Sequence, residues 1–154
     1  MNPRSRMRDL GLTLPAPAAP VASYQPLIVH DGLAHLSGQL PFIDGELVTG
    51  RLGDELSLDR GIEVARACAL MIIAQLEKAH LLDRVERIVK LGVFVNSDPS
   101  FMDQPKVANG ASDLMFDVFG DAGRHARSAV GVAALPLGAA VEIDALVAIS
   151  GSDL

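Results

Sequence analysis

Two charged residues stand in apolar stretches near the end of the chain. Arg127 opens the run "RSAVGVAAL", and Glu142 lies inside "AVEIDALVAI". An arginine carries a planar fork of donors that binds two oxygens of a carboxylate or phosphate. A carboxylate near it can orient a water molecule or accept a proton. An Arg127–Glu142 ion pair that holds a subunit interface is the other interpretation, and residue chemistry alone leaves both open.

Both residues fall in predicted strands, which are separated by the turn "LPLG" at residues 135–138. Side chains alternate between the two faces of a strand, so Val130 shares one face with the other bulky residues of the first run. We expect these bulky faces to meet the helices. Arg127 and Glu142 are then predicted to share the opposite face, where the small residues Ala129 and Gly131 leave a hollow beside the arginine.

The rest of the chain predicts the elements around these strands. Asp31-Gly32 is a strong hairpin turn signal between two apolar runs, and a third strand is expected near residues 47–52. Ser57 is a predicted N-cap of a helix over 57–80, a strand follows over 87–97, and a second helix spans 103–119. This order predicts an α+β fold with a six-stranded, mostly antiparallel sheet and two helices on one face. Self-association is the simplest cover for the other face.

Length and composition predict one domain, with a Pro/Ala-rich leader over residues 1–23 and a single domain over 24–154. No apolar run is long enough to cross a membrane, and no continuous apolar signal region opens the chain, so a cytoplasmic protein is expected. The net charge of −6, from 19 acidic and 13 basic residues, works against nucleic-acid binding.

Residue types also argue against a metal centre. The four histidines are scattered, and a single cysteine, Cys68, allows neither an intramolecular disulfide nor a cysteine cluster. Cys68 lies inside the first long predicted helix, next to its apolar face, and is expected to pack in the core. We therefore expect no metal centre.

Three segments carry a resemblance to a known family: "HLSGQLP" at 35–41, "VANGASDLMFDVFG" at 107–120 and "ARSAVGVAALPLGAAVEIDALVAI" at 126–149. They resemble, in this order, the Ser-Gly-Gln-aliphatic-Pro element, the asparagine-bearing second helix and the C-terminal signature of the Rid (YjgF) family of reactive intermediate imine/enamine deaminases. The resemblance covers nearly all of the chain after the leader. It implies a chorismate mutase-like fold, a homotrimer with sites between subunits, and cofactor-free hydrolysis of 2-imino or 2-enamino acids to 2-keto acids and ammonia.

The resemblance also implies roles for individual residues. Arg127 stands where the family binds the substrate carboxylate, and Glu142 where it positions the attacking water. The implied substrate-binding residues are Tyr24, Ser37, Gly38, Asn109 and Ala129. Ala129 departs from the family pattern, since many active members have a cysteine there. Ser37 and Asn109 would alternatively serve in caps or turns.

Two other functions fit the same residues. A protein that binds a keto acid or amino acid as a regulator, without catalysis, would also need the arginine. An endoribonuclease is a third reading, which the acidic charge and the scarcity of aromatic residues weigh against.

Overall fold

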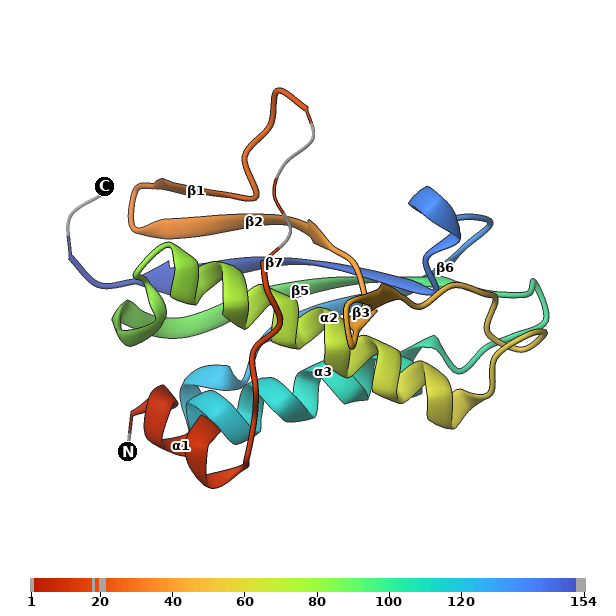
Figure 1. The fold of residues 1–154 in the computed structure, drawn as a ribbon, viewed down its shortest axis with the longest axis horizontal. Helices are drawn as coiled ribbons and strands as arrows, with labels where there is room; N and C mark the ends of the chain where they lie inside the picture. The colour runs from red at the N-terminus through yellow and green to blue at the C-terminus, as the bar shows by residue number, and fades with distance from the viewer. Residues whose placement is uncertain (1, 18, 20–21, 152–154) are drawn as a thin grey trace.

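The computed structural model describes residues 2–17, 19 and 22–151 of the chain, and it has the predicted α+β architecture (Figure 1). Helices and strands alternate irregularly along the chain, and three short 3₁₀ turns connect some of them. In chain order the elements are α1 (Pro3–Asp9), β1 (Leu27–His30), β2 (Leu33–Gln39), β3 (Phe42–Ile43), β4 (Glu46–Leu47), α2 (Leu58–Lys78), η1 (Leu82–Arg84), β5 (Val85–Asn96), α3 (Gln104–Phe119), η2 (Gly120–Gly123), β6 (Ala126–Val132), η3 (Pro136–Gly138) and β7 (Val141–Ile149).

The main sheet has five strands in the order β1-β2-β7-β5-β6, in which only the β5–β6 pair is parallel. The predicted hairpin turn is confirmed, because Asp31 and Gly32 both adopt positive φ between β1 and β2. The third strand predicted near residues 47–52 is not part of this sheet, so the predicted count of six strands is wrong. Strands β3 and β4 form a separate small hairpin, and positive φ at Gly50 turns the following segment so that it does not continue as a strand.

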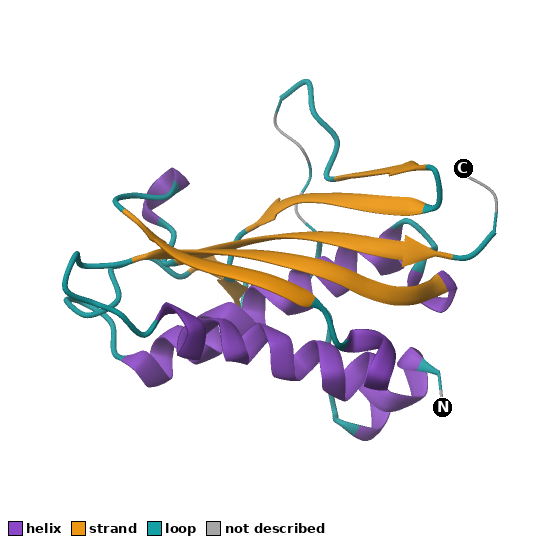
Figure 2. Ribbon diagram, turned by 180° about the vertical axis from the view of Figure 1, so that it is seen from behind, coloured by secondary structure: helices purple, strands orange, loops and turns teal. Residues whose placement is uncertain are grey.

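Helices α2 and α3 cover one face of this sheet, and within the described ranges the opposite face has no helix apart from the single turn η3 at its end (Figure 2). The Ser57 hydroxyl accepts a hydrogen bond from the Arg60 amide, as a helix N-cap does. The two helices cross closely at Gly110, where an added Cβ would lie 2.0 Å from the Ile62 carbonyl oxygen. Glycine at this crossing therefore sets the position of α3 relative to α2.

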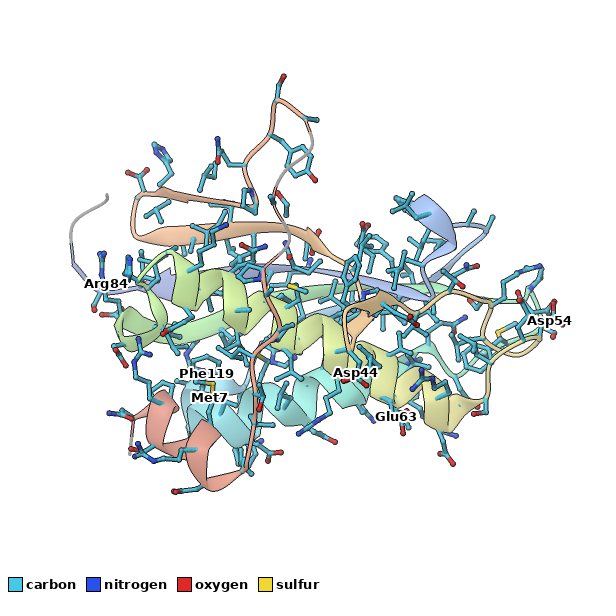
Figure 3. The ribbon with its side chains drawn as sticks, in the orientation of Figure 1. Met7, Asp44, Asp54, Glu63, Arg84 and Phe119 are labelled. Atoms are coloured by element: carbon cyan, nitrogen blue, oxygen red, sulfur yellow. The ribbon has the colours of Figure 1, made fainter. Side chains whose placement is uncertain are left out.

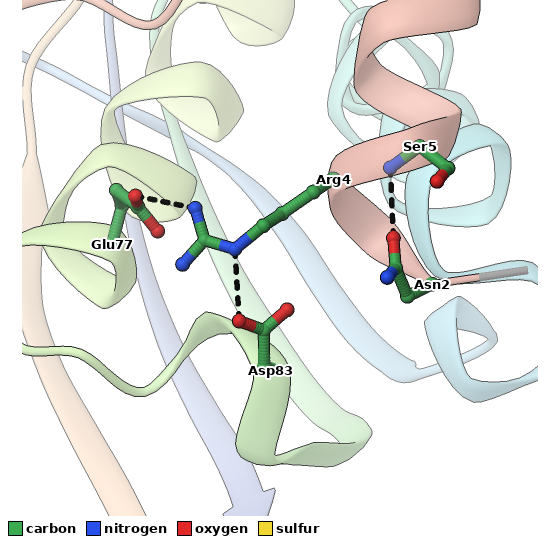
Figure 4. Close-up of polar contacts among 5 residues, drawn as sticks. All are labelled: Asn2, Arg4, Ser5, Glu77 and Asp83. Atoms are coloured by element: carbon green, nitrogen blue, oxygen red, sulfur yellow. Dashed lines mark hydrogen bonds and ion pairs between the residues drawn. The ribbon is translucent and has the colours of Figure 1, made fainter.

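A third helix, α1, forms in the predicted leader and packs against the domain. Its Met7 joins the buried core close to Phe119 at the end of α3 (Figure 3). The Arg4 guanidinium donates to Glu77 Oε1 at 2.6 Å and to Asp83 Oδ2 at 2.8 Å (Figure 4). The two-helix prediction missed α1 because a seven-residue helix carries little periodic signal of its own.

Candidate functional site

Arg127 lies on β6, and its side chain points toward α3. The parallel pairing of β6 with β5 places Arg127 beside Leu91, a fully buried core residue on the helix-covered face. The Arg127 guanidinium donates from Nη1 to Asn109 Oδ1 at 2.8 Å and to Ser112 Oγ at 3.1 Å, both on α3. The prediction that Arg127 shares the helix-free face with Glu142 is therefore wrong.

The small residues of β6 explain the error. Ala129 packs against the core on the side of α3, and an added Cβ at Gly131 would lie 2.7 Å from the Gln104 side chain. Val130 points the other way and is 45% exposed. Small side chains at these positions thus make room for an approaching helix, whereas alternation alone assigned the helices to the bulkier side.

His125, just before β6, extends the contacts of Arg127 into a chain of hydrogen bonds. Its Nδ1 lies 2.6 Å from the Gly123 carbonyl oxygen and its Nε2 lies 2.9 Å from Ser112 Oγ. A carbonyl oxygen can only accept, so Nδ1 carries the proton and donates to Gly123. In the neutral ring Nε2 then accepts from the Ser112 hydroxyl.

Gly123 allows this arrangement by its lack of a side chain. An added Cβ would lie 2.1 Å from the Met115 carbonyl oxygen, so the turn η2 could not lie as close to α3 with any other residue. The close approach brings His125 and Ser112 together beside a hollow of about 330 Å³. The hollow is lined by Ser112, Asp113, Phe116, Gly123, Arg124, His125 and Arg127.

Arg127 keeps part of its guanidinium free for a ligand. Both hydrogen bonds to α3 use Nη1, and among the described residues neither Nε nor Nη2 has a hydrogen-bond partner. The side chain is thus held in place by α3 and retains two donors, enough for a bidentate pair with a carboxylate.

Glu142 lies on the helix-free face of β7, as predicted, because its neighbours Val141 and Ile143 are fully buried toward the helices. Its carboxyl group lies over Gly38 of β2, where an added Cβ would come within 2.7 Å of Cδ. Partial burial and, to a smaller extent, the charge of Asp144 raise the pKa of the Glu142 carboxyl above its usual range. Glu142 is thus more basic than a fully solvated carboxylate.

Tyr24 and Gly38 line a second hollow of about 200 Å³, which also contains Leu137 of the turn η3. Ser37 lies next to it, but its hydroxyl donates to the Gln25 carbonyl oxygen at 2.7 Å. That bond stabilises the entry to the β1–β2 hairpin, so the structural alternative for Ser37 is observed. Tyr24 is half exposed at the edge of the hollow.

The predicted site residues therefore form two groups within one subunit. Arg127 and Asn109 lie at the β6 edge on the helix-covered face, whereas Gly38 and Glu142 meet on the other face. Strand β5 lies between β6 and β7, so β6 and β7 are two strand spacings apart, roughly 10 Å. A small substrate cannot contact Arg127 and Glu142 of the same subunit together.

Ser112 and His125 were not among the predicted site residues, although the sequence contained a signal for each. Ser112 follows Asn109 by three residues, which places both on one face of a helix. His125 precedes Arg127 by two residues, the spacing of side chains on one face of an extended segment. Neither spacing is informative until α3 and β6 are known to be neighbours.

Other features of the described residues carry no catalytic arrangement. A further hollow, of about 790 Å³, lies between residues 13–16, the β3–β4 hairpin and α2. It shares Phe42 and Met71 with the hollow of Tyr24 and Gly38, but none of the predicted site residues lines it. Cys68 is fully buried, and burial raises the pKa of its thiol, as expected for a core residue. Within the described ranges no group of three or more His, Cys, Asp or Glu side chains could hold a metal ion. No helix of the described part is long and apolar enough to span a membrane.

Comparisons with known proteins agree with this architecture. The chain is 55% identical to the Trypanosoma cruzi protein TCP17 over 93% of this chain and 91% of that protein. A solved structure of unknown function from Agrobacterium tumefaciens is 42% identical, covers 96% of this chain and 92% of its own, and superposes with a TM-score of 0.89. A Yersinia pestis member of the Rid family is 29% identical, with coverages of 90% and 96% and a TM-score of 0.62.

The match to a family description is equally extensive. Residues 4–148, which include most of α1, match the family described as "YjgF/chorismate mutase-like, putative endoribonuclease". Because the match covers nearly the whole chain and the fold agrees with solved relatives, this protein belongs to the YjgF/Rid family.

Proposed function

We propose that this protein hydrolyses 2-imino acids and their 2-enamine tautomers to 2-keto acids and ammonia, without a metal or cofactor. Membership of the YjgF/Rid family supports this class of reaction, since the sequence elements that resemble the deaminases include the residues described above. The finer assignment rests on the chemistry of the site.

The observation that carries the proposal is the state of Arg127. Asn109 and Ser112 hold its guanidinium through Nη1, and two further donors remain available beside a hollow of about 330 Å³. Such a group suits the carboxylate that 2-imino and 2-keto acids share, because both carboxylate oxygens can be bound at once. A substrate held in this way would occupy the hollow that Ser112 and His125 also line.

In this proposal Glu142 acts from a neighbouring copy of the chain, because within one subunit it lies on the opposite face from Arg127. The helix-free face also exposes apolar side chains to water, which is unfavourable. Ile28 is 54% exposed and Val130 is 45% exposed on this face. We propose that a homotrimer buries this face and brings Arg127 of one copy and Glu142 of the next to a shared cleft, where Glu142 positions the attacking water.

A coupled assay tests the activity. An amino-acid oxidase generates 2-imino acids in solution, and the rate of 2-keto acid formation is compared with and without the protein. We expect the protein to accelerate keto-acid formation and the Arg127→Ala variant to lose the acceleration. If the parent protein binds 2-keto acids but leaves the rate unchanged for several imino acids, the deaminase proposal is wrong and a binding function remains.

Endoribonuclease activity is part of the name of the family. The net charge of −6 weighs against it in this chain, because phosphate contacts supply most of the affinity for RNA. Cleavage of single-stranded RNA by the pure protein would be the contrary result.

A further inference from the structure

We infer that Ser112 and His125 form the proton-transfer pair of the Arg127 site, and that His125, through the Ser112 hydroxyl, moves the protons of imine hydrolysis. The inference rests on the proposed deamination and adds two residues to its chemistry. A nucleophile or relay hydroxyl, a histidine base and a group that orients the base are the recurring parts of such arrangements.

The hydrogen bonds between Arg127, Ser112, His125 and Gly123 all run in one direction, from donor to acceptor. Gly123 accepts from Nδ1 at 2.6 Å, so the lone pair of the neutral ring lies on Nε2, 2.9 Å from Ser112 Oγ. Ser112 therefore donates its proton to His125, and its oxygen accepts from Arg127 Nη1 at 3.1 Å. A proton that reaches Ser112 Oγ can pass to His125 while the serine gives up its own.

The pair also lies where the reaction would occur. Ser112 and His125 are both half-buried and line the same hollow as Arg127. A carboxylate bound to the free donors of Arg127 has its carbon one bond from the imine carbon. Since Arg127, Ser112 and His125 line one hollow, a substrate that occupies it lies beside the serine and the histidine.

The proton balance needs such a relay. Water adds to the imine carbon as its proton passes through Ser112 to His125, and the imine nitrogen takes up a proton to give a carbinolamine. The carbon–nitrogen bond then breaks as the remaining hydroxyl proton is transferred to nitrogen. The products are a 2-keto acid and ammonia, so one water is consumed and no electrons are exchanged. Protons must leave oxygen and reach nitrogen twice, and a histidine serves both directions.

Asp113 is the competing base, because among the described residues it is the one carboxylate that lines this hollow. The Asp113 side chain is exposed, and among the described residues no ion pair or hydrogen bond orients its carboxylate toward Arg127. The ordered contacts of His125 favour the histidine. Asp113→Asn is therefore a matched control, a neighbouring substitution that removes a base and preserves shape.

The experiment compares His125→Ala, His125→Gln, Ser112→Ala and Asp113→Asn with the parent. The coupled assay gives kcat for each, and titration with pyruvate gives binding to the Arg127 site. We expect kcat to fall by about a hundredfold or more in the two His125 variants and in Ser112→Ala. Pyruvate binding should stay within a few-fold of the parent in the two His125 variants, where Asn109 and Ser112 still hold Arg127, and Asp113→Asn should retain the parent kcat. Added imidazole should restore part of the turnover of His125→Ala.

The contrary outcomes are distinct. Parent-like kcat in both His125 variants, or a loss of turnover that follows a proportional loss of pyruvate binding, would overturn the inference and leave the deaminase proposal standing. A parent protein without imine hydrolysis would overturn both. If His125→Ala does not fold, His125→Gln still tests the point, since the amide can keep a hydrogen bond to Ser112 but cannot transfer protons.

Discussion

Arg127 lies on the helix-covered face of the sheet, opposite to the face that the sequence predicted. Its guanidinium is held by two side chains of α3, so its position depends on a helix that is distant in sequence. A surface arginine with no such partners would lose considerable side-chain freedom on binding a ligand. Arg127 has already lost that freedom in the folded chain, which favours tight carboxylate binding.

Substitution of Arg127 separates ligand binding from an interface role. Arg127→Ala should weaken pyruvate binding by about 2–5 kcal/mol, which is more than tenfold, and leave the assembly intact. Arg127→Lys should restore little, because an ammonium cannot reproduce the planar fork. Calorimetric titration and light scattering on the same samples measure both properties. If instead Arg127→Ala and Glu142→Ala loosen the assembly equally, an ion pair between subunits is the better reading.

Glu142 has a pH-dependent cost to stability. Burial, with a smaller effect of Asp144, raises the carboxyl pKa in the folded chain, so the unfolded chain releases its proton first as the pH increases. The cost is absent below the ordinary pKa of about 4.3 and grows until the pH passes the raised pKa. Glu142→Gln should therefore stabilise the protein at neutral pH and have no effect near pH 3.

The size of this gain is no more than about 1 kcal/mol, because the two carboxylates are partly solvated. Denaturant unfolding of the parent and Glu142→Gln at both pH values measures it. Asp144→Asn is the control, and it should recover a smaller part of the gain, since burial is the larger cause. A variant that is less stable than the parent at neutral pH would contradict the assignment.

At the scale of elements, the position of α3 decides the geometry of the site. This helix carries Asn109 and Ser112, and Gly110 between them touches the backbone of α2. A change at the helix crossing therefore acts on structure and site together. Gly123 has the corresponding role at the other end of α3, where it lets η2 lie against the helix.

Gly110→Ala should be strongly destabilising. The added methyl group would meet the Ile62 carbonyl oxygen at 2.0 Å, a backbone atom that cannot rotate away. Overpacking of this kind costs about 1–3 kcal/mol or more, against the small gain in helix propensity. Thermal unfolding measures the effect, with the exposed Asp117→Ala on the same helix as control. An unchanged midpoint in Gly110→Ala would show that the helices separate easily.

The elements that sequence predicted well are those with local signals. The Asp31-Gly32 turn, the Ser57 cap and the end of α3 at Gly120 depend on residues within a few positions of one another. The face of β6 depends on its parallel pairing with β5, in which Arg127 pairs with Leu91, 36 residues earlier in the chain. Alternation fixes which residues share a face, but the pairing decides which face meets the helices.

For the whole molecule, the uncovered sheet face leads to a prediction about mass. A homotrimer of the 16.2 kDa chain should be found by sedimentation equilibrium at micromolar concentration. Val130→Asp places a charge on the exposed face of β6 and should shift the mass toward one subunit, because an unpaired charge opposes burial. Lys106→Asp on the outer surface of α3 is a control that should leave the mass unchanged. A parent protein that stays monomeric would contradict the shared-cleft proposal.

The separation of Arg127 and Glu142 on opposite faces has a genetic consequence. If each site takes its arginine from one copy and its carboxylate from the next, two inactive variants can complement each other. Neither Arg127→Ala nor Glu142→Gln has an intact site alone. When an equal mixture of the two is dissociated and reassembled, a site is intact only if its arginine comes from a Glu142→Gln copy and its carboxylate from an Arg127→Ala copy. Each condition is met with a probability of about one half, so about one quarter of the subunit interfaces should contain an intact site. Two defective alleles expressed in one cell should then yield partial activity. The double variant, which carries both substitutions on the same chain, should yield none.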